Sequence, residues 1–328
     1  MSALSSHFGL RFGGLSLLCC FFSGLLLISL GSSVPASAAP KASKPTAKFP
    51  RTGTVVAWGD NSSGQATVPA GLTGVVAVAA GDNYSLALKS DGTVVAWGAQ
   101  GYEFEVAVPA GLADVTAIAA GYGQSLALKK DGTVTVWGGA ETVPAGLSGA
   151  NAIAAGRHFG MALKKGGTVV GWGSGWDAPP TGLSQVIAIA AGRNHALALK
   201  SDGTVVTWGS MTSVPVGLSG VIAIAAGHGS CLALKSDGTV TAWGSAEAAP
   251  ASLSHVVAIA LGDDFCLALK SDGKVVKWGG ASQGNEFGVI FGGQTHSNQT
   301  TMPPDLSPAF AIAAGKAHIL ALVSPPSP

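Results

Sequence analysis

Charged residues are scarce in this sequence. Asp, Glu, Lys and Arg make up 11% of its 328 residues, less than half of the roughly 25% in an average soluble domain. From residue 52 onward, 13 Lys and Arg stand against 17 Asp and Glu, a net charge of −4. Proteins that bind nucleic acid through its phosphates need a basic face. The composition therefore argues against a nucleic-acid partner.

Cysteine is also rare, with four residues in the chain. Cys19 and Cys20 lie in an apolar N-terminal run, which leaves Cys231 and Cys266 for the folded part. These two take equivalent places in consecutive copies of a repeat, too far apart for the short Cα–Cα distance of a disulfide. We expect two buried thiols that pack as small hydrophobic side chains.

Motifs for catalysis and metal binding are missing as well. The chain has no Gly-x-Ser-x-Gly nucleophile elbow, no His-Glu-x-x-His zinc motif and no phosphate-binding loop. No closely spaced pair of ligands indicates a metal site, and we expect no cofactor. Helical periodicity is absent after the N-terminal segment. These absences favour an all-β binding protein over an enzyme.

The N-terminus has the pattern of an export signal. Arg11 precedes an apolar run of 16 residues, 15–30, and Ala36-Ser37-Ala38 supplies small residues for cleavage. The run is interrupted by Ser and Gly and is shorter than the roughly 20 residues of a membrane-spanning helix. We predict a signal peptide at 1–38 and a flexible linker rich in Pro, Ala and Lys at 39–52. The mature protein is then secreted, periplasmic or on the cell surface, without a membrane span.

A repeated unit occupies most of the remaining chain. Trp-Gly occurs seven times at intervals of 35 to 40 residues, and a glycine that ends an Ala-rich run also occurs seven times. Repeats of this length are typical of propeller blades and solenoid units. In the unit that begins at Val76, the sequence predicts an inner strand at 76–80, a second strand at 86–89 and a third at 94–97. Trp97 is expected to fill the gap between blades.

The connections within this unit predict two further features. Asp91-Gly92 indicates a two-residue hairpin whose turn needs positive φ. Val108-Pro109 is expected to form a fourth, edge strand, because proline cannot donate a hydrogen bond within a central ladder.

The two ends of the repeat array complement each other. The first unit begins at 53–59 and lacks its first two strands, and the last unit, 311–322, supplies only those two. A solenoid would need capping ends instead. We therefore predict an all-β, seven-bladed β-propeller over 53–323, closed by pairing of the N-terminal strand with the C-terminal half-blade. A Pro-rich tail follows at 324–328, and we expect a monomer.

The pattern Ala-Ile-Ala-Ala-Gly-x-x-x-x-Leu-Ala-Leu-Lys-x-Asp-Gly-x-Val-x-x-Trp-Gly resembles the regulator of chromosome condensation repeat. The opening Val-Val-Ala-Trp-Gly-Asp-Asn at 55–61 is similar to secreted β-lactamase inhibitory proteins that carry such repeats. The resemblance implies a propeller, and an enzyme inhibitor is one function it implies. Nuclear members exchange nucleotide on a small GTPase and bind chromatin. The export signal and the acidic body disfavour that role here.

Three residues follow each repeat glycine, and they vary where the rest of the unit is constant. Strand order places these triplets around the mouth of the central channel, on the face opposite the uniform Ser-Asp-Gly hairpins. Variable aromatic and charged positions on a constant scaffold favour a binding surface. The first triplet position is the better candidate for solvent-facing contacts: Asp82, Tyr122, Arg157, Arg193, His228, Asp263 and Lys316. His158 and Asp264, at the second position, are further candidates.

The third triplet position has two interpretations. Tyr84 and Phe159 are candidate contacts, but these residues and Phe265 could instead pack inside the blades. His195 and His318 stand where the family has a structural histidine, so packing is favoured there.

Three long loops after Trp-Gly should share the face of the triplets. Loops 60–67, 99–107 and 280–301 lie on consecutive blades once the ring closes, whereas the other four blades have short loops. Their aromatic residues are expected to anchor a protein partner, together with one aromatic residue of a short loop; the candidates are Tyr102, Phe104, Phe287, Phe291 and Trp176.

The sequence thus predicts an exported protein-binding propeller, for which an enzyme inhibitor is a concrete candidate. A cell-surface adhesion or scaffold protein is the alternative. A hydrolase or lyase at the channel mouth is disfavoured, because its candidate residues (His158, Arg193, His228, Asp263 and Asp264) match no specific catalytic arrangement.

Overall fold

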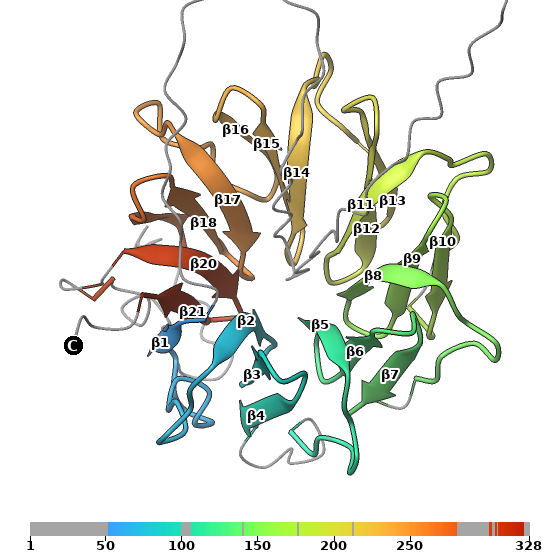
Figure 1. Ribbon diagram of the computed structural model, residues 1–328. Coiled ribbons are helices and arrows are strands. Elements are labelled where there is room, and N and C mark those ends of the chain that lie inside the picture. Colours follow the sequence, from blue (N-terminus) through green and yellow to red (C-terminus); the bar gives the residue numbers. More distant parts are fainter. Residues whose placement is uncertain are drawn as a thin grey trace, which may run out of the picture.

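The structure, a computed structural model, describes residues 52–99, 106–139, 141–175, 177–211, 213–280, 302–303, 306 and 308–324. These residues form 21 β-strands arranged in seven sheets around a central axis (Figure 1). The predicted seven-bladed propeller is therefore confirmed. The predicted signal peptide, the linker up to residue 51 and residues 325–328 of the tail lie outside the described residues.

Each sheet is antiparallel and has three strands. The inner strands are β2 (Val75–Ala80), β5 (Val115–Ala120), β8 (Ala150–Ala155), β11 (Val186–Ala191), β14 (Val221–Ala226), β17 (Val256–Leu261) and β20 (Ala309–Ala314). The middle strands are β3 (Tyr84–Lys89), β6 (Ser125–Lys129), β9 (Gly160–Lys164), β12 (His195–Lys200), β15 (Ser230–Lys235), β18 (Phe265–Lys270) and β21 (His318–Val323). The outer strands are β1 (Thr54–Gly59), β4 (Val94–Gly98), β7 (Val134–Trp137), β10 (Val169–Trp172), β13 (Val205–Gly209), β16 (Val240–Gly244) and β19 (Val275–Gly279).

The two ends of the chain meet in one blade, as predicted. β1 pairs with β21 from Thr54 opposite Val323 to Gly59 opposite His318, and β21 pairs in turn with β20. The N-terminal strand thus completes a sheet that begins more than 250 residues later. The middle strand β21 is therefore paired on both sides.

Small and medium apolar side chains build the core. The last four residues of every inner strand are buried. Six of the middle strands are buried up to the half-buried lysine that ends them, and the seventh, β21, is buried throughout. Alanine dominates the inner strands because seven strands crowd around one axis and leave little side-chain volume. The Leu-Ala-Leu pattern of the middle strands then fills the space between sheets, where burial of each leucine contributes about 1.5–3 kcal/mol.

Tryptophans connect neighbouring blades, also as predicted. The indole N–H groups of Trp97, Trp208 and Trp278 donate to backbone carbonyls in the loop of the preceding blade, at 2.8 to 3.0 Å. Six of the seven Trp-Gly tryptophans are buried, and Trp243 is half-buried. The tryptophan therefore fixes the spacing of adjacent sheets.

The expected fourth strand is wrong, because the described residues contain none beyond the third in any blade. A turn takes its place. The leucine N–H of each Pro-x-x-Leu segment donates to the proline carbonyl three residues earlier, as from Leu72 to Pro69 and from Leu112 to Pro109. Gly71 and Gly111 occupy the third turn position with φ of 75° and 78°, which side chains disfavour.

The hairpins between middle and outer strands also differ from the prediction. Gly92 N–H donates to Lys89 C=O and has φ of 80°, whereas Asp91 has no positive φ. The connection is thus a three-residue turn with glycine at its last position, not a two-residue turn. Asp91 accepts hydrogen bonds from the backbone N–H and hydroxyl of Thr93, and these bonds, with a further one from Lys89, lower the pKa of its carboxyl. The aspartate therefore serves the turn, as expected.

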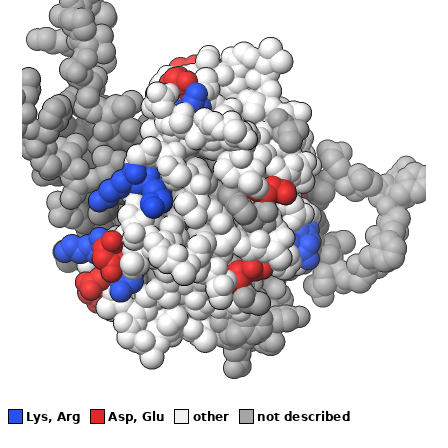
Figure 2. All heavy atoms as spheres, turned by 90° about the vertical axis from the view of Figure 1, so that its right-hand side faces the viewer, with Lys and Arg blue, Asp and Glu red and all other residues white. Residues whose placement is uncertain are grey.

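Charged side chains are sparse on the surface as well. Figure 2 shows one side of the molecule, where a few Lys, Arg, Asp and Glu residues of both signs, some of them in small mixed groups, lie among uncharged ones. No helix occurs in the described ranges, and so none there has the length and apolar character to cross a membrane.

Candidate functional site

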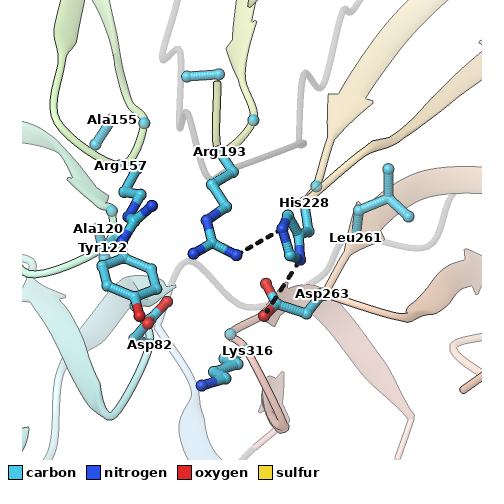
Figure 3. Close-up of a pocket in the computed structure, with 18 of the residues that line it drawn as sticks. Asp82, Ala120, Tyr122, Ala155, Arg157, Arg193, His228, Leu261, Asp263 and Lys316 are labelled. Atoms are coloured by element: carbon cyan, nitrogen blue, oxygen red, sulfur yellow. Dashed lines mark hydrogen bonds and ion pairs between the residues drawn. The ribbon is translucent and has the colours of Figure 1, made fainter. Parts of the chain in front are cut away.

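The first residue after each repeat glycine lines the mouth of the central channel. The inner strands end there, and their last Ala-Gly or Leu-Gly pair forms the wall of a cavity of about 70 Å³. Figure 3 shows the side chains that converge on it. We call these seven residues, which the sequence predicted to lie at this place, the mouth ring: Asp82, Tyr122, Arg157, Arg193, His228, Asp263 and Lys316.

Hydrogen bonds between blades hold the backbone of the mouth ring. Five of its members donate their backbone N–H to a carbonyl of the next blade. Examples are Tyr122 to Gly156 (3.3 Å), Arg193 to Gly227 (3.1 Å) and Lys316 to Gly81 (3.2 Å). The last of these closes the circle between the C-terminal blade and the blade of β2. Because the backbone alone forms these bonds, the side chains can differ from blade to blade without loss of the mouth's shape.

Two arginines and a tyrosine form one edge of the mouth ring. The guanidinium carbon of Arg157 lies 4.9 Å from the centre of the Tyr122 ring, and that of Arg193 lies 5.4 Å from it. Cations are attracted to the face of an aromatic ring at such distances. Tyr122 therefore holds two positive charges close together at the mouth.

One hydrogen bond and one longer polar contact link three residues of the ring. Nη1 of Arg193 lies 2.6 Å from Nε2 of His228, and Nδ1 of His228 lies 4.0 Å from Oδ2 of Asp263 (Figure 3). Arginine is always a donor, so Nε2 of His228 accepts and its proton resides on Nδ1, facing Asp263. Burial raises the pKa of the Asp263 carboxyl, although His228, Lys316 and Arg193 oppose that shift.

His158 and Asp264, at the second triplet position, are exposed beside the mouth. The carbonyl of His158 accepts the N–H of Gly175, which attaches the short loop after Trp172 to this triplet. The equivalent bond from Ala99 to Asn83 attaches the loop after Trp97. Gly175 and Ala99, which follow Trp-Gly in their blades, therefore lie beside the triplets.

Two of the predicted contact residues are buried instead. Tyr84 is 0% and Phe159 is 2% exposed. Their rings lie against Gly81 and Gly156, where an added Cβ would overlap them. Tyr84 also donates its hydroxyl to the carbonyl of Gln124 in the next blade. Packing is the correct interpretation of this position, and neither residue presents a surface to a partner.

Buried histidines occupy the same third position in two other blades. His195 and His318 are 1% and 0% exposed, and burial lowers the pKa of each to about 4. Nε2 of His318 lies 3.0 Å from the hydroxyl of Ser85, across the closing blade interface. The residue three positions after the repeat glycine of these blades therefore packs in the interior, which decides between the two interpretations that the sequence left open for Tyr84 and Phe159.

Loop 60–67 is ordered by its own side chains. Asp60 accepts the N–H of Ser62, Gln65 accepts that of Ser63, and Asn61 accepts that of Ala66. Asp60 and Gln65 are buried. The predicted contact residues of the other loops lie outside the described residues: Tyr102, Phe104, Trp176, Phe287 and Phe291.

Cysteines and metal-ligand types do not add a second site. Cys231 and Cys266 are free and buried, as predicted, and burial raises the pKa of each thiol to about 12. A thiol in that state is a poor nucleophile and ligand. Within the described ranges, no three His, Cys, Asp or Glu side chains are grouped so as to hold a metal ion.

Residues 75–102 and 186–213 match the family model of the regulator of chromosome condensation (RCC1) repeat. Each match starts with an inner strand and extends past the Trp-Gly of its blade. These two segments of the chain are therefore similar to the RCC1 repeat. No curated protein sequence matches it.

Solved structures share the fold at low sequence identity. Prp20p of Saccharomyces cerevisiae, studied for its binding properties to Gsp1p and histones, is 17% identical over 84% of this chain and 92% of its own, with a TM-score of 0.64. Yeast RCC1 (Prp20) bound to Kap60 is 16% identical over 90% and 97%, with a TM-score of 0.63. The ectodomain of the Physcomitrella patens receptor kinase CR4 is 21% identical over 76% and 71%, with a TM-score of 0.62.

Proposed function

We propose that this chain is an exported propeller that binds another protein through its mouth ring and the loops on the same face. The observation that carries this proposal is the contrast at the channel mouth. Seven side chains of unlike chemistry stand on a backbone that repeats seven times and is fixed by hydrogen bonds between blades. A rigid frame with variable aromatic and charged side chains suits recognition, because little order has to be gained on binding.

The comparisons are consistent with this use of the fold. Yeast RCC1 has a solved complex with the protein Kap60, and Prp20p was studied with Gsp1p and histones. Export is supported by the N-terminal sequence, in which an apolar run precedes small residues. An exported propeller with a rigid face could occlude the active site of a secreted or periplasmic enzyme, and class A β-lactamases are the first candidates.

Catalysis is not favoured by the mouth ring. It contains no Ser, Thr or Cys as a nucleophile, and its one histidine accepts a hydrogen bond from an arginine. We therefore propose binding without a chemical step.

Inhibition of class A β-lactamases by the purified chain tests the inhibitor part directly. We expect inhibition at micromolar protein or below, and we expect it to weaken about tenfold when Tyr122 is replaced by alanine. Lys130→Ala, on the opposite face in the hairpin after β6, is the matched control and should inhibit like the wild type. Absence of inhibition at micromolar protein would reject the inhibitor function and leave adhesion or scaffolding. Hydrolysis that is lost in Asp263→Asn or His228→Gln would reject binding without chemistry.

A further inference from the structure

Positive charge gathers on one edge of the mouth ring. Going around the ring, Arg157 and Arg193 are neighbours, and the two carboxylates, Asp82 and Asp263, lie to either side of the segment from Tyr122 to His228. With His228 neutral, the ring has three cations and two carboxylates, a net charge of +1. The mouth is therefore a cationic spot on a body whose charge is −4 from residue 52 onward.

The two arginines have guanidinium N–H donors that are available to a ligand. Within the described residues, neither guanidinium lies within 4.0 Å of a carboxylate. One N–H group of Arg193 donates to His228. The Nε–H groups of both arginines are buried without a hydrogen-bond partner. A guanidinium offers five N–H donors in a planar fork. Both forks extend into the mouth beside Tyr122 (Figure 3).

We infer that the edge formed by Tyr122, Arg157 and Arg193 binds a carboxylate group, presented by an acidic side chain of the protein partner. This inference rests on the proposed function and names the partner's chemistry. A guanidinium fork matches the two oxygens of a carboxylate. The cavity of about 70 Å³ admits a small planar group but not a folded segment of chain, so the partner projects one side chain into it.

The charge of the ring distinguishes a carboxylate from a phosphate group. A single negative charge brings the mouth ring from +1 to neutral. A dianionic phosphate would leave an excess negative charge next to Asp263, whose side chain is only 31% exposed. Like charges so close together in a partly buried site repel each other. The ring therefore favours the monoanion.

The test uses the purified full chain and two blocked peptides, N-acetyl-Gly-Gly-Glu-Gly-Gly-amide and its Gln counterpart. Guanidinium N–H signals in NMR spectra report binding at Arg157 and Arg193. We expect the Glu peptide to shift both signals and the Gln peptide to leave them unchanged. Sodium acetate should bind more weakly than the Glu peptide, and inorganic phosphate should not bind more tightly than acetate.

Lysine variants distinguish binding by the planar guanidinium group from attraction to a positive charge alone. Arg157→Lys and Arg193→Lys keep the charge but lose the planar donor pair, so each should weaken binding of the Glu peptide about fivefold. Lys130→Met removes a charge from the opposite face and should bind the peptide like the wild type. Thermal unfolding of each variant checks that the propeller is intact.

Three results would overturn the inference: equal shifts with the Glu and Gln peptides, unchanged affinity in both lysine variants, or phosphate binding tighter than acetate. Acetate binding as tight as that of the Glu peptide would overturn the assignment of the carboxylate to a protein side chain. None of these measurements needs the partner. A chain that binds the Glu peptide but inhibits no enzyme and captures no protein would count against the proposed function alone.

Discussion

Steric contacts explain why a glycine follows each inner strand. In five blades, at Gly81, Gly156, Gly192, Gly262 and Gly315, an added Cβ would overlap a ring three residues later. In the blades of Gly121 and Gly227 it would overlap a backbone carbonyl of the next blade. This glycine therefore permits both interior packing and the close approach of blades at the channel mouth.

Replacement of Gly156 by alanine tests this requirement. The methyl group would overlap the ring of Phe159, which is 2% exposed and has no room to move. We expect a loss of about 2 kcal/mol or more in the free energy of unfolding, measured by chemical denaturation. Gly175→Ala is the control, since its Cβ would make an ordinary contact with His158, 3.4 Å away. Equal stability of the two variants would refute the packing argument.

The buried histidines make stability depend on pH. The folded-state pKa of His318 is about 4, against 6.5 for the exposed group. The unfolded chain therefore takes up the proton first, and stability is lost as pH falls from about 6.5 to about 4. At 1.36 kcal/mol per pKa unit, the loss is roughly 3 kcal/mol for this residue.

His318→Phe should remove this part of the pH dependence. Two other blades already have phenylalanine at the equivalent position, at Phe159 and Phe265, with the same contact to glycine. Ser85 loses its contact with His318 but still donates its hydroxyl to Gln65. Between pH 6.5 and 4 the wild type should lose roughly 3 kcal/mol more unfolding free energy than the variant. Parallel curves would show that His318 is not buried in the neutral form.

At the scale of elements, the contact between adjacent blades depends on tryptophans in two different states. Trp208 donates its indole N–H to Asp177 of the preceding blade at 2.8 Å. Trp172 is equally buried, but its indole N–H has no hydrogen-bond partner among the described residues. The two side chains therefore offer a matched pair in which packing is similar and hydrogen bonding differs.

Trp208→Phe should destabilise the propeller more than Trp172→Phe. Both variants lose similar packing, but only the first also leaves a carbonyl without its donor, a difference of about 1 kcal/mol. Chemical denaturation of both variants in parallel measures it. A larger loss in Trp172→Phe would contradict the assigned bond.

Sequence patterns predicted strands better than connections. Alternation and Ala-rich runs gave the inner, middle and outer strands, because those residues are buried in a regular way. Pro109 suggested an edge strand, yet the glycine two positions later turns the chain instead. Whether a proline segment pairs or turns depends on its neighbours in space. Local sequence does not contain that information.

The candidate site was predictable to a similar degree. Strand order alone placed the mouth ring. The contacts from Arg193 through His228 to Asp263 were not predictable, because these residues are 35 positions apart and meet only when neighbouring blades pack together. Burial of Tyr84 and Phe159 depends on the missing Cβ of the glycine three residues earlier, a signal visible in the sequence only once the packing is known.

At the scale of the whole molecule, one blade joins the two ends of the chain. Its three strands come from 54–59 and 309–323. Lys316 bonds to Gly81, and His318 contacts Ser85, in the next blade. The circle of seven blades therefore depends on the last two strands.

Deletion of residues 309–328 should open the ring. β1 would lose its partner, and the inner strand β17 and the blade of β2 would lose a neighbour. We expect the thermal midpoint to fall by more than about 10 °C, measured by circular dichroism. Deletion of 325–328 alone leaves all 21 strands in place and serves as the control. A truncated chain with the wild-type midpoint would contradict closure by this blade.

The central claim is that the constant residues form the frame and the mouth ring carries recognition. The most direct measurement compares capture of exported proteins by the immobilised wild-type chain and by the triple variant Tyr122→Ser, Arg157→Ser, Arg193→Ser. We expect thermal midpoints within about 3 °C of each other, because these side chains pack on the surface of the mouth. We also expect the protein retained by the wild type to be lost from the variant. Retention of the same protein by an equally stable variant would show that the mouth ring does not carry recognition.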